Sequence, residues 1–594
     1  MQSVFGHNEF RAFQEETVDT ILSGNDVLTI IPTGSGKSLC YQLPAIIMDG
    51  VTIVVSPLIA LMHDQVVALK ANGIKAAMIS SANKAFDNEE ILYQAQIGQL
   101  DLLYVSPERL TTKNFLDELR TIKISFFVID EAHCVSEWGH EFREDYRRLG
   151  IIKQNFPKAH IAAFTATATQ IVEKDIVKSL SLQNNKIFRG KTYRDNLMIR
   201  TQKRVDNGYA QLLDFIQHYP NQSGIVYTLS RREAEQVAEY LKSKGYNSAP
   251  YHAGLSARIR ERIYHGFATD NTQIIVATIA FGMGVDKSNI RYVVHMTMPK
   301  TIENYYQEIG RAGRDGLQSE TMLLYSKSDE LRRQGFMYNI EDEEYKKLLV
   351  EKLRHMYHLA SGAECRHKEI AEYFGDDINN CKSHCDNCTK GKIEQADISI
   401  SAQKALLAIK ETGESSGSTH IISVLRGSKN QVIRELGHNE ISSYASGLDK
   451  TKQEWSAIIE RLLEVDAIDI VDNRILTLSS FGKEVLEGKA SISIDQDKIG
   501  RIMAIKPTIQ QVIGNAYFDM FKKKRKEIAD KLDIPAYTIF SDKALLEIAQ
   551  KLPITRNEML SISGVGETKF ERYGKQFIEL AVACKLAETA FAIK

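Results

Sequence analysis

A glycine-rich loop near the N-terminus has the residue types that bind a nucleotide phosphate. It directly follows an apolar run at 27–31. Glycines let backbone N–H groups converge on a β-phosphate, a lysine bridges the β- and γ-phosphates, and a hydroxyl ligates Mg²⁺. The strict consensus has glycine where Ile31 stands, so a plain glycine turn is the alternative, but the preceding strand favours a phosphate site. This phosphate loop consists of Thr33, Gly34, Ser35, Gly36, Lys37 and Ser38.

Two adjacent acids follow another apolar run, at 126–129. An acid at the carboxyl end of a parallel strand lies beside the phosphate loop. Asp130 can therefore hold Mg²⁺ through water, and Glu131 can orient or deprotonate the attacking water. Two acids can also merely cap a helix, but together with Lys37 they predict nucleotide hydrolysis.

Two arginines, Arg311 and Arg314, follow Gln307 farther along the chain and are expected on one helical face. In an ATPase built from two lobes, such arginines cross the cleft and neutralise charge on the γ-phosphate, which is worth roughly 10³ to 10⁵ in rate. A surface salt-bridge pair is the alternative. We take all three residues as candidate catalytic residues.

Four of the seven cysteines lie close together in a polar stretch, CKSHCDNC and the cysteine upstream of it. Four thiolates satisfy tetrahedral zinc and leave no open position, so the predicted site is structural. Reduced buried cysteines are the alternative, and His384 is a lesser candidate ligand. The predicted ligands are Cys365, Cys381, Cys385 and Cys388.

Short apolar runs separated by helix-length stretches indicate the elements that hold these residues. The period is that of parallel α/β sheets, and a break near 202–208 separates two sets of runs. We therefore expect two sheets. The runs lie at 27–31, 51–56, 102–106, 126–130 and 161–165, then at 224–228, 274–278 and 292–296.

Composition limits the remaining possibilities. The 594 residues correspond to about four folding units, and 43% hydrophobic with 25% charged residues excludes global disorder. The net charge of −1 gives no bulk attraction to a polyanion, so nucleic acid must bind to local patches. We find neither a signal peptide nor an apolar membrane span in the sequence, and the cysteines are too sparse for a disulfide scaffold; the cytoplasm is the expected compartment.

Together, the motifs resemble a superfamily 2 helicase of the DEAH-box kind, and specifically the RecQ-family DNA helicases. The resemblance implies an α/β fold with two RecA-like lobes, then a zinc-binding helical module, a winged helix and an all-helical HRDC domain, at 1–201, 202–335, 336–395, 396–490 and 511–594. Further matching segments are Phe5-Gly6, Phe10-Arg11, 56–62 with Asp64-Gln65, 106–109, 165–168, 251–255 and 277–284.

The same resemblance identifies an adenine-sensing segment around residue 10. Arg11 and Gln14 match it, and the Gln14 amide is suited to read the adenine edge through paired hydrogen bonds. The family usually has a tyrosine-like aromatic where His7 stands. His7 can still stack on adenine, with less ring area.

An aromatic loop at 134–143, CVSEWGHEFR, resembles the loop that marks RecQ proteins. Trp138 and Phe142 could stack on bases, and Arg143 could hold a phosphate. The short connection to Glu131 would let DNA adjust the hydrolytic site. Core aromatics are the alternative, but polar residues interleave with these rings.

The C-terminal third resembles two DNA-binding modules. Short strands at 467–471 and 475–479 with a tip at 472–474 suggest a winged helix that grips duplex DNA, and the tip has no aromatic wedge. In the HRDC-like region, Tyr537 is a candidate for stacking on single-stranded DNA, helped by the basic run 522–526. That run could equally be a solvated helix face.

These features predict a monomer-capable, ATP-dependent DNA helicase that uses ATP, Mg²⁺ and Zn²⁺. The resemblance implies 3′ to 5′ movement on single-stranded DNA, unwinding of duplex or branched DNA in recombination and repair, a place at the bacterial nucleoid, and single-strand-binding or repair proteins as partners. An RNA helicase and a DNA-binding or annealing module with a regulatory ATPase are the alternatives.

Overall fold

The computed structural model describes residues 1–80, 83–138, 142–279, 281, 287–337, 340–389, 395–471, 475–495, 516–532 and 534–592. Its contacts divide the chain into two compact units. The first unit comprises Met1–Glu330, Met337–Cys388 and Pro507–Lys594, and the second comprises Leu331–Phe336 and Thr389–Lys506.

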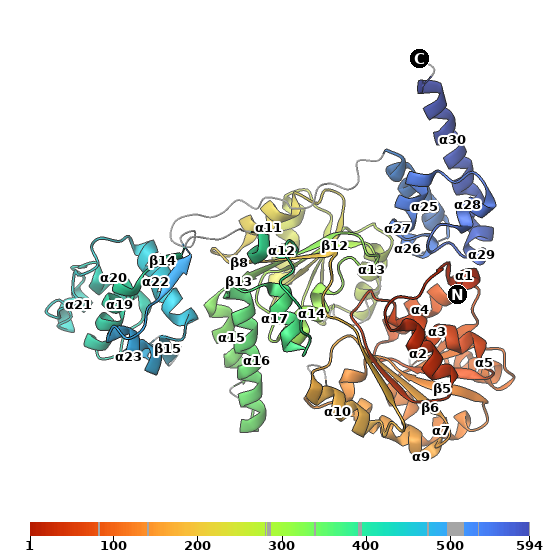
Figure 1. Ribbon diagram of the computed structural model, residues 1–594, viewed down its shortest axis with the longest axis horizontal. Helices are drawn as coiled ribbons and strands as arrows, with labels where there is room; N and C mark the ends of the chain where they lie inside the picture. The colour runs from red at the N-terminus through yellow and green to blue at the C-terminus, as the bar shows by residue number, and fades with distance from the viewer. Residues whose placement is uncertain are drawn as a thin grey trace. The chain divides into compact units, whose positions relative to one another are not determined.

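The first lobe is a seven-stranded parallel sheet in the order β3-β4-β2-β5-β6-β1-β7, with helices packed along it (Figure 1). Its strands are β1 Val27–Ile30, β2 Val51–Val55, β3 Ala76–Ile79, β4 Leu102–Val105, β5 Ile124–Ile129, β6 His160–Thr165 and β7 Lys186–Arg189. Its main helices are α1 Gln2–Phe5, α2 Gln14–Leu22, α3 Lys37–Ile47, α4 Ile59–Ala71, α5 Ala85–Gln96, α7 Lys113–Leu119, α8 Glu144–Arg147 and α10 Gln170–Ser179.

Both faces of this sheet are buried. Successive residues of a strand point to opposite faces, so Leu28 and Ile30 belong to one hydrophobic cluster while Val27 belongs to the other. Continuous apolar runs result, and helices cover both sides. The carboxyl ends of the strands, where the polar motifs begin, therefore meet at one edge.

The second lobe is a six-stranded parallel sheet in the order β10-β11-β9-β12-β13-β8. Strand β8 runs across the expected boundary at 201/202 and belongs to this sheet. The strands are β8 Leu197–Lys203, β9 Ser223–Tyr227, β10 Ser248–Tyr251, β11 Ile274–Ala277, β12 Ile290–His295 and β13 Ser319–Tyr325. The helices are α11 Tyr209–Ile216, α12 Arg231–Ser243, α13 Ala257–Ala268 and α14 Ile302–Ile309.

A helical module follows and shares the core of the second lobe. Its helices are α15 Lys327–Met337, α16 Glu343–Ser361, α17 Arg366–Tyr373 and α18 Asp386–Thr389. Leu353, Met356 and Ile370 lie in the same hydrophobic cluster as Ile199 and Leu323 of the sheet. The module is therefore an extension of the lobe and has no separate core.

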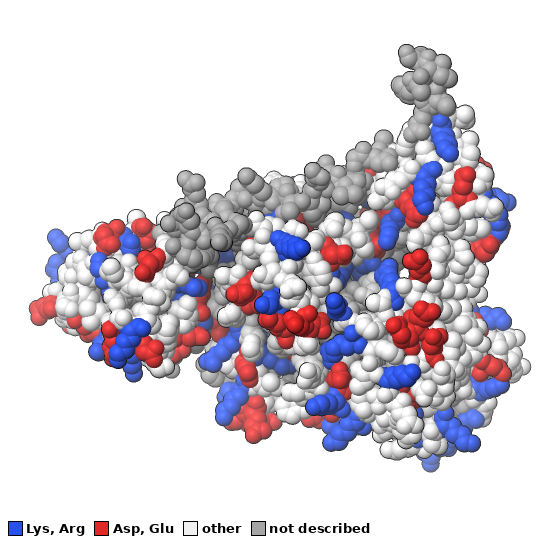
Figure 2. Space-filling view, viewed as in Figure 1, with Lys and Arg blue, Asp and Glu red and all other residues white. Residues whose placement is uncertain are grey.

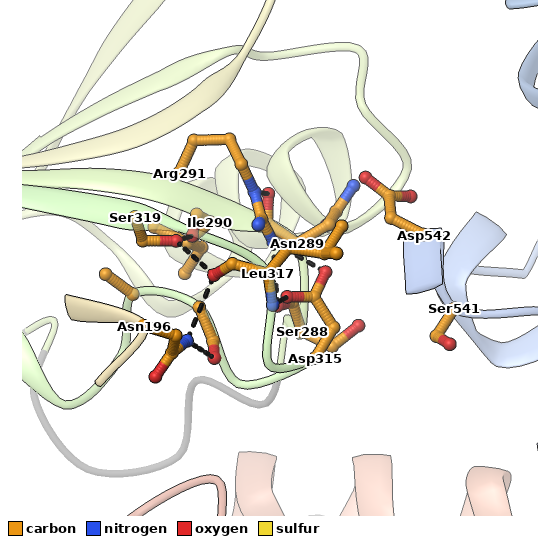
Figure 3. Close-up of polar contacts among 12 residues, drawn as sticks. Asn196, Ser288, Asn289, Ile290, Arg291, Asp315, Leu317, Ser319, Ser541 and Asp542 are labelled. Atoms are coloured by element: carbon orange, nitrogen blue, oxygen red, sulfur yellow. Dashed lines mark hydrogen bonds and ion pairs between the residues drawn. The ribbon is translucent and has the colours of Figure 1, made fainter. Parts of the chain in front are cut away.

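The C-terminal helices form their own hydrophobic cluster and dock on the second lobe. Buried Arg525 pairs with Asp542, and Asp542 faces the buried Arg291–Asp315 pair of that lobe (Figure 3). Lys526 donates to Thr269 O at 3.0 Å. The helices are α25 Ala516–Leu532, α26 Ala536–Ile539, α27 Asp542–Lys551, α28 Arg556–Leu560, α29 Glu567–Lys569 and α30 Lys575–Ala592.

The second unit has the expected winged-helix elements. Strands β15 Ile468–Val471 and β16 Ile475–Leu478 pair antiparallel, as predicted, and the tip at 472–474 lies outside the described residues. Strands β14 Gln395–Asp397 and β17 Ser493–Asp495 also pair, so the fold extends past the expected end at 490. Its helices are α19 Ser399–Glu411, α20 Ser418–Leu425, α21 Gln431–Glu435, α22 Lys452–Glu464 and α23 Ser480–Leu486.

The surface agrees with the near-zero net charge. Basic and acidic side chains are interspersed on the face shown in Figure 2. Among the helices that the structure describes, none combines the length and apolar character that a membrane span requires.

Candidate active site

The phosphate loop connects β1 to the start of α3. Gly34 and Gly36 have φ angles of 81° and 82°, which favour glycine because side chains with a Cβ are strained there. Helix α3 begins at Lys37, so its free N–H groups and positive dipole end face the loop. The strand, turn and helix together form the anion-binding geometry expected from the sequence.

The acids predicted to act on water lie at the end of β5. Glu131 has a left-handed backbone, φ 50° and ψ 46°, and its N–H donates to Asp130 Oδ1 at 3.0 Å. Burial, followed by the charge of Glu131, raises the pKa of Asp130 to about 6, although Lys37 opposes the shift. A nearby cation therefore favours the ionised form of this carboxyl.

His133 ties Glu131 to the next strand. Its Nδ1 lies 3.3 Å from Glu131 Oε2 and 2.9 Å from the hydroxyl of Thr165. Thr165 in turn donates to Thr167 O at 3.1 Å. Sequence reasoning gave His133 no role; its place directly after the two acids was the available signal.

The two lobes meet at the phosphate loop. Thr33 Oγ1 donates to Gly310 O at 2.9 Å, and a Cβ on Gly310 would lie only 2.2 Å from that hydroxyl oxygen. Residue 310 must therefore be glycine for this close approach. Arg311, beside it, is only 2% exposed.

One cavity of about 630 Å³ collects the candidate nucleotide residues. The first lobe contributes the phosphate loop and both acids, and the second lobe contributes Gln307, Arg311 and Arg314. Ser35 does not line the cavity. The expected residues on its wall are His7, Arg11, Gln14, Thr33, Gly34, Gly36, Lys37, Ser38, Asp130, Glu131, Gln307, Arg311 and Arg314.

Gln14 lines the cavity and also contacts the phosphate loop. Its amide donates to Ser35 O and Gly36 O, each at 3.1 Å, and its Oε1 accepts from Arg11 N at 2.8 Å. Arg11 Nη1 donates to Gly34 O at 2.7 Å. The amide thus supports the phosphate loop, and recognition of adenine by Gln14 stays a prediction.

The C-terminal helical domain contributes to the same cavity, which sequence reasoning missed. Its wall includes Lys543, Glu547, Ser561 and Ser563. Gly564 N donates to Gly6 O at 2.8 Å, next to His7. Burial first, then the cations Arg11, Lys569 and Lys543, lower the pKa of His7, which favours the neutral ring.

The rings of the aromatic loop are accessible. Trp138 is 48% exposed and Phe142 39%, so they are not core aromatics. Arg143 Nη1 donates to Pro57 O at 3.0 Å. Residues 139–141 of this loop lie outside the described residues. None of the three candidate DNA residues lines the nucleotide cavity.

The four cysteines come together as the spacing predicted. Their sulfur atoms all lie within 4.8 Å of one another, which suits the four thiolates of a tetrahedral zinc site with Zn–S bonds of about 2.3 Å. His384 points elsewhere, with Nδ1 2.9 Å from Tyr193 Oη. Ile199 N donates to His384 O at 3.0 Å, so the cluster is fastened to β8.

The basic run at 522–526 is not a simple solvated face. Arg525 is buried against Asp542, and Lys526 contacts the second lobe. Tyr537, the candidate stacking residue, is half-buried on α26, which contacts α4 of the first lobe. Domain docking therefore engages Lys526, a residue of the basic run that we expected to assist DNA binding.

Comparisons with known proteins agree with these elements. The DEAD/DEAH box helicase family matches residues 11–175, and the helicase conserved C-terminal domain matches 207–316. The RecQ zinc-binding family matches 327–389, the RQC domain 392–501 and the HRDC domain 515–580.

The chain is also similar to whole curated proteins. It is 40% identical to the ATP-dependent DNA helicase RecQ of Haemophilus influenzae over 98% of this chain and 94% of that protein. The corresponding protein of Bacillus subtilis is 39% identical over 97% of this chain and 96% of its own length. With five family matches in order along two lobes, a four-cysteine module, a winged helix and a helical C-terminal domain, the chain belongs to the RecQ helicase family.

Proposed function

We propose that this chain is an ATP-dependent DNA helicase that moves 3′ to 5′ on single-stranded DNA and separates duplex or branched DNA in recombination and repair. One observation carries the proposal: Lys37 and Glu131 of one lobe share a cavity with Arg311 and Arg314 of the other. A nucleotide bound there joins the two lobes. Its hydrolysis would release them.

The chain's own residues account for hydrolysis. Backbone N–H groups of the phosphate loop and the Lys37 ammonium hold the phosphates, and Glu131 takes a proton from the attacking water. Arg311 and Arg314 neutralise charge that develops on the γ-phosphate. Ser38 and Asp130 would hold Mg²⁺, which supplies further positive charge to the phosphate oxygens.

The zinc role rests on the cysteine cluster. Four thiolates within bonding range of one ion leave no place for a substrate, so zinc would stabilise the fold. Its position next to β8 means that it would fix the helical module to the second lobe.

We infer the substrate from the names of the relatives, and the 3′ to 5′ direction is what the resemblance to RecQ helicases implies. Those of H. influenzae and B. subtilis are named DNA helicases, and we infer the same substrate, with action in the cytoplasm at the nucleoid. We also propose Trp138, Phe142 and Arg143 as contacts to single-stranded DNA, because the two rings are exposed. We also propose the five predicted domains in their chain order, with β8 counted in the second lobe and β17 in the winged helix.

Unwinding of forked duplexes tests the proposal. Wild-type protein should separate a fork with a 3′ single-stranded arm, require ATP, and leave a 5′-armed duplex paired. Lys37→Ala and Glu131→Gln should abolish unwinding and retain DNA binding. Glu144→Gln, an exposed surface change on the same lobe, should unwind normally.

Two outcomes would reject this function. Hydrolysis stimulated by single-stranded RNA and not by DNA would identify an RNA helicase. Strand separation that survives both Lys37→Ala and Glu131→Gln would mean that the ATPase is regulatory.

A further inference from the structure

Lys352 joins three parts of the first unit at one ammonium group. It belongs to α16 of the zinc-binding module. Its Nζ donates to Trp138 O of the aromatic loop at 3.1 Å and to Glu303 Oε1 of α14 at 2.8 Å. The side chains of Lys352 and Glu303 are only 12% and 5% exposed. Because water is largely excluded, this ion pair is screened much less than a surface pair.

Helix α14 leads from this contact to the nucleotide cavity. All eight of its residues are buried, so the helix is held on every side. Glu303 and Gln307 lie four residues apart, on the same helical face, and Gln307 lines the cavity. Arg311 lies two residues after the end of the helix, on the same wall.

The module holds Glu303 from a second direction. Tyr373 of α17 lies beside its carboxylate, and burial followed by this negative charge raises the pKa of the tyrosine hydroxyl. Lys352 and Tyr373 therefore fix Glu303 within the second lobe. The hydrogen bond to Trp138 O is different, because it crosses to the first lobe.

We propose that Lys352 is a positioning residue that couples the aromatic loop to α14, so that DNA held on the loop favours the arrangement in which Gln307 and Arg311 face the nucleotide. The hydrogen bond can form only when the loop lies against the module. DNA that orders Trp138 would thus stabilise lobe closure through Lys352. This proposal rests on the proposed function, since it requires hydrolysis that DNA stimulates.

Hydrolysis with and without DNA tests the coupling. Lys352→Met keeps the length of the side chain and removes its charge and its hydrogen-bond donors. We expect DNA-independent hydrolysis, and DNA affinity in the absence of nucleotide, to stay at the wild-type level, and stimulation by single-stranded DNA to fall about tenfold. Lys352→Arg, which keeps a charged donor, should recover part of the stimulation. Lys347→Met, an exposed change on the same helix, is the matched control.

A double variant separates positioning from folding. Lys352→Met leaves the buried Glu303 carboxylate without its cation, which destabilises the fold by itself. Lys352→Met with Glu303→Gln removes that buried charge as well. The double variant should regain thermal stability and still lack stimulation, because the donor to Trp138 O is missing.

The outcomes distinguish the two proposals. Wild-type hydrolysis that ignores DNA would reject the proposed function. If the wild type is stimulated by DNA, four results would overturn the coupling role. They are full stimulation in Lys352→Met, an equal loss of basal and stimulated hydrolysis, weakened DNA binding measured by fluorescence anisotropy without nucleotide, and a double variant that regains stimulation.

Discussion

Gly34 and Arg314 lie together where the lobes meet, and this contact places the arginine beside the phosphate loop. A Cβ on Gly34 would lie 3.2 Å from the Arg314 Cα, so the phosphate loop and the arginine share one small space. A phosphate bound to the loop would therefore occupy the cavity that Arg314 also lines.

Replacing this arginine should therefore slow the chemical step. Arg314→Ala should lower kcat for ATP hydrolysis by roughly 10³-fold, because it removes the positive charge that stabilises the γ-phosphate in the transition state. Nucleotide affinity should change far less. Single-turnover hydrolysis and equilibrium binding of a fluorescent ATP analogue measure the two effects. Arg258→Ala, exposed on the same lobe, is the control, and a variant that hydrolyses ATP at the wild-type rate would exclude this role.

The exposed ring of Trp138 should affect only hydrolysis that DNA stimulates. Trp138→Ala removes a stacking surface worth about 1 to 3 kcal/mol per base. We expect DNA-stimulated hydrolysis to fall while basal hydrolysis persists. Phe86→Ala removes an even more exposed aromatic of the same lobe, 75% against 48% for Trp138, and should change neither rate. Equal loss of both rates would mark Trp138 as a packing residue.

Among the elements, the runs predicted as strands are those with continuous apolar residues, and five strands described in the two lobes were missed: β3, β7, β8, β10 and β13. Strand β13 begins Ser-Glu-Thr, and its buried Glu320 is paired with Arg200 of β8. A buried ion pair makes a core strand look polar in the sequence. Strand β10 contains Pro250, and β7 begins with the exposed Lys186 and ends with the half-buried Arg189. Alternation and hydropathy are weak signals at such edges.

The nucleotide site also contains residues that the sequence predicts and residues that it does not. The phosphate loop, the acids and the arginines were predictable because each set lies within a few residues of sequence, after a strand or on one helical face. Lys543 and Glu547 were not, since they reach the cavity only through docking of α27. Lys352 likewise carries no motif, and its role depends on contacts between distant segments.

The ion pair that anchors α27 predicts a pH dependence. Burial opposes ionisation of Asp542, but Arg525, Lys522 and Arg291 lower its pKa to about 2. A lowered carboxyl pKa stabilises the fold above the unfolded value near 4, and this stability is lost as the pH falls toward 2. Asp542→Asn should cost about 2.5 kcal/mol at pH 7 and progressively less below pH 4.

Hydrogen exchange of α25 and α27 amides measures this effect in the full chain. Asp519→Asn, an exposed change on α25, should leave protection unchanged. If the Asp542→Asn variant showed wild-type protection at pH 7, the pair would not stabilise the domain.

The cysteine cluster predicts one zinc ion per chain. Cys385→Ala should release the metal and unfold the module, because structural zinc contributes folding free energy directly. Metal analysis and far-ultraviolet circular dichroism check this. Cys584→Ala changes a buried cysteine outside the cluster and should keep the zinc. Active wild-type protein free of zinc would refute the assignment.

For the whole molecule, the charge pattern predicts how DNA binding depends on salt. A net charge of −1 provides no global attraction, so the affinity must come from a few local phosphate contacts. The slope of log K against log salt for single-stranded DNA should therefore be modest, about −0.7 per phosphate neutralised. Fluorescence anisotropy titrations at several salt concentrations measure it, and a slope near −10 would require an extended basic track.

The core that the second lobe shares with the helical module sets a minimum length for the motor. A chain ending at residue 335 would lack Leu353, Met356 and Ile370, and would leave Leu323 and its neighbours open to water. Such a truncated protein should aggregate during expression, whereas one that extends through Cys388 should remain dispersed. Evolutionary shortening or recombination of this gene would then have to keep the coding regions of the second lobe and of the helical module together.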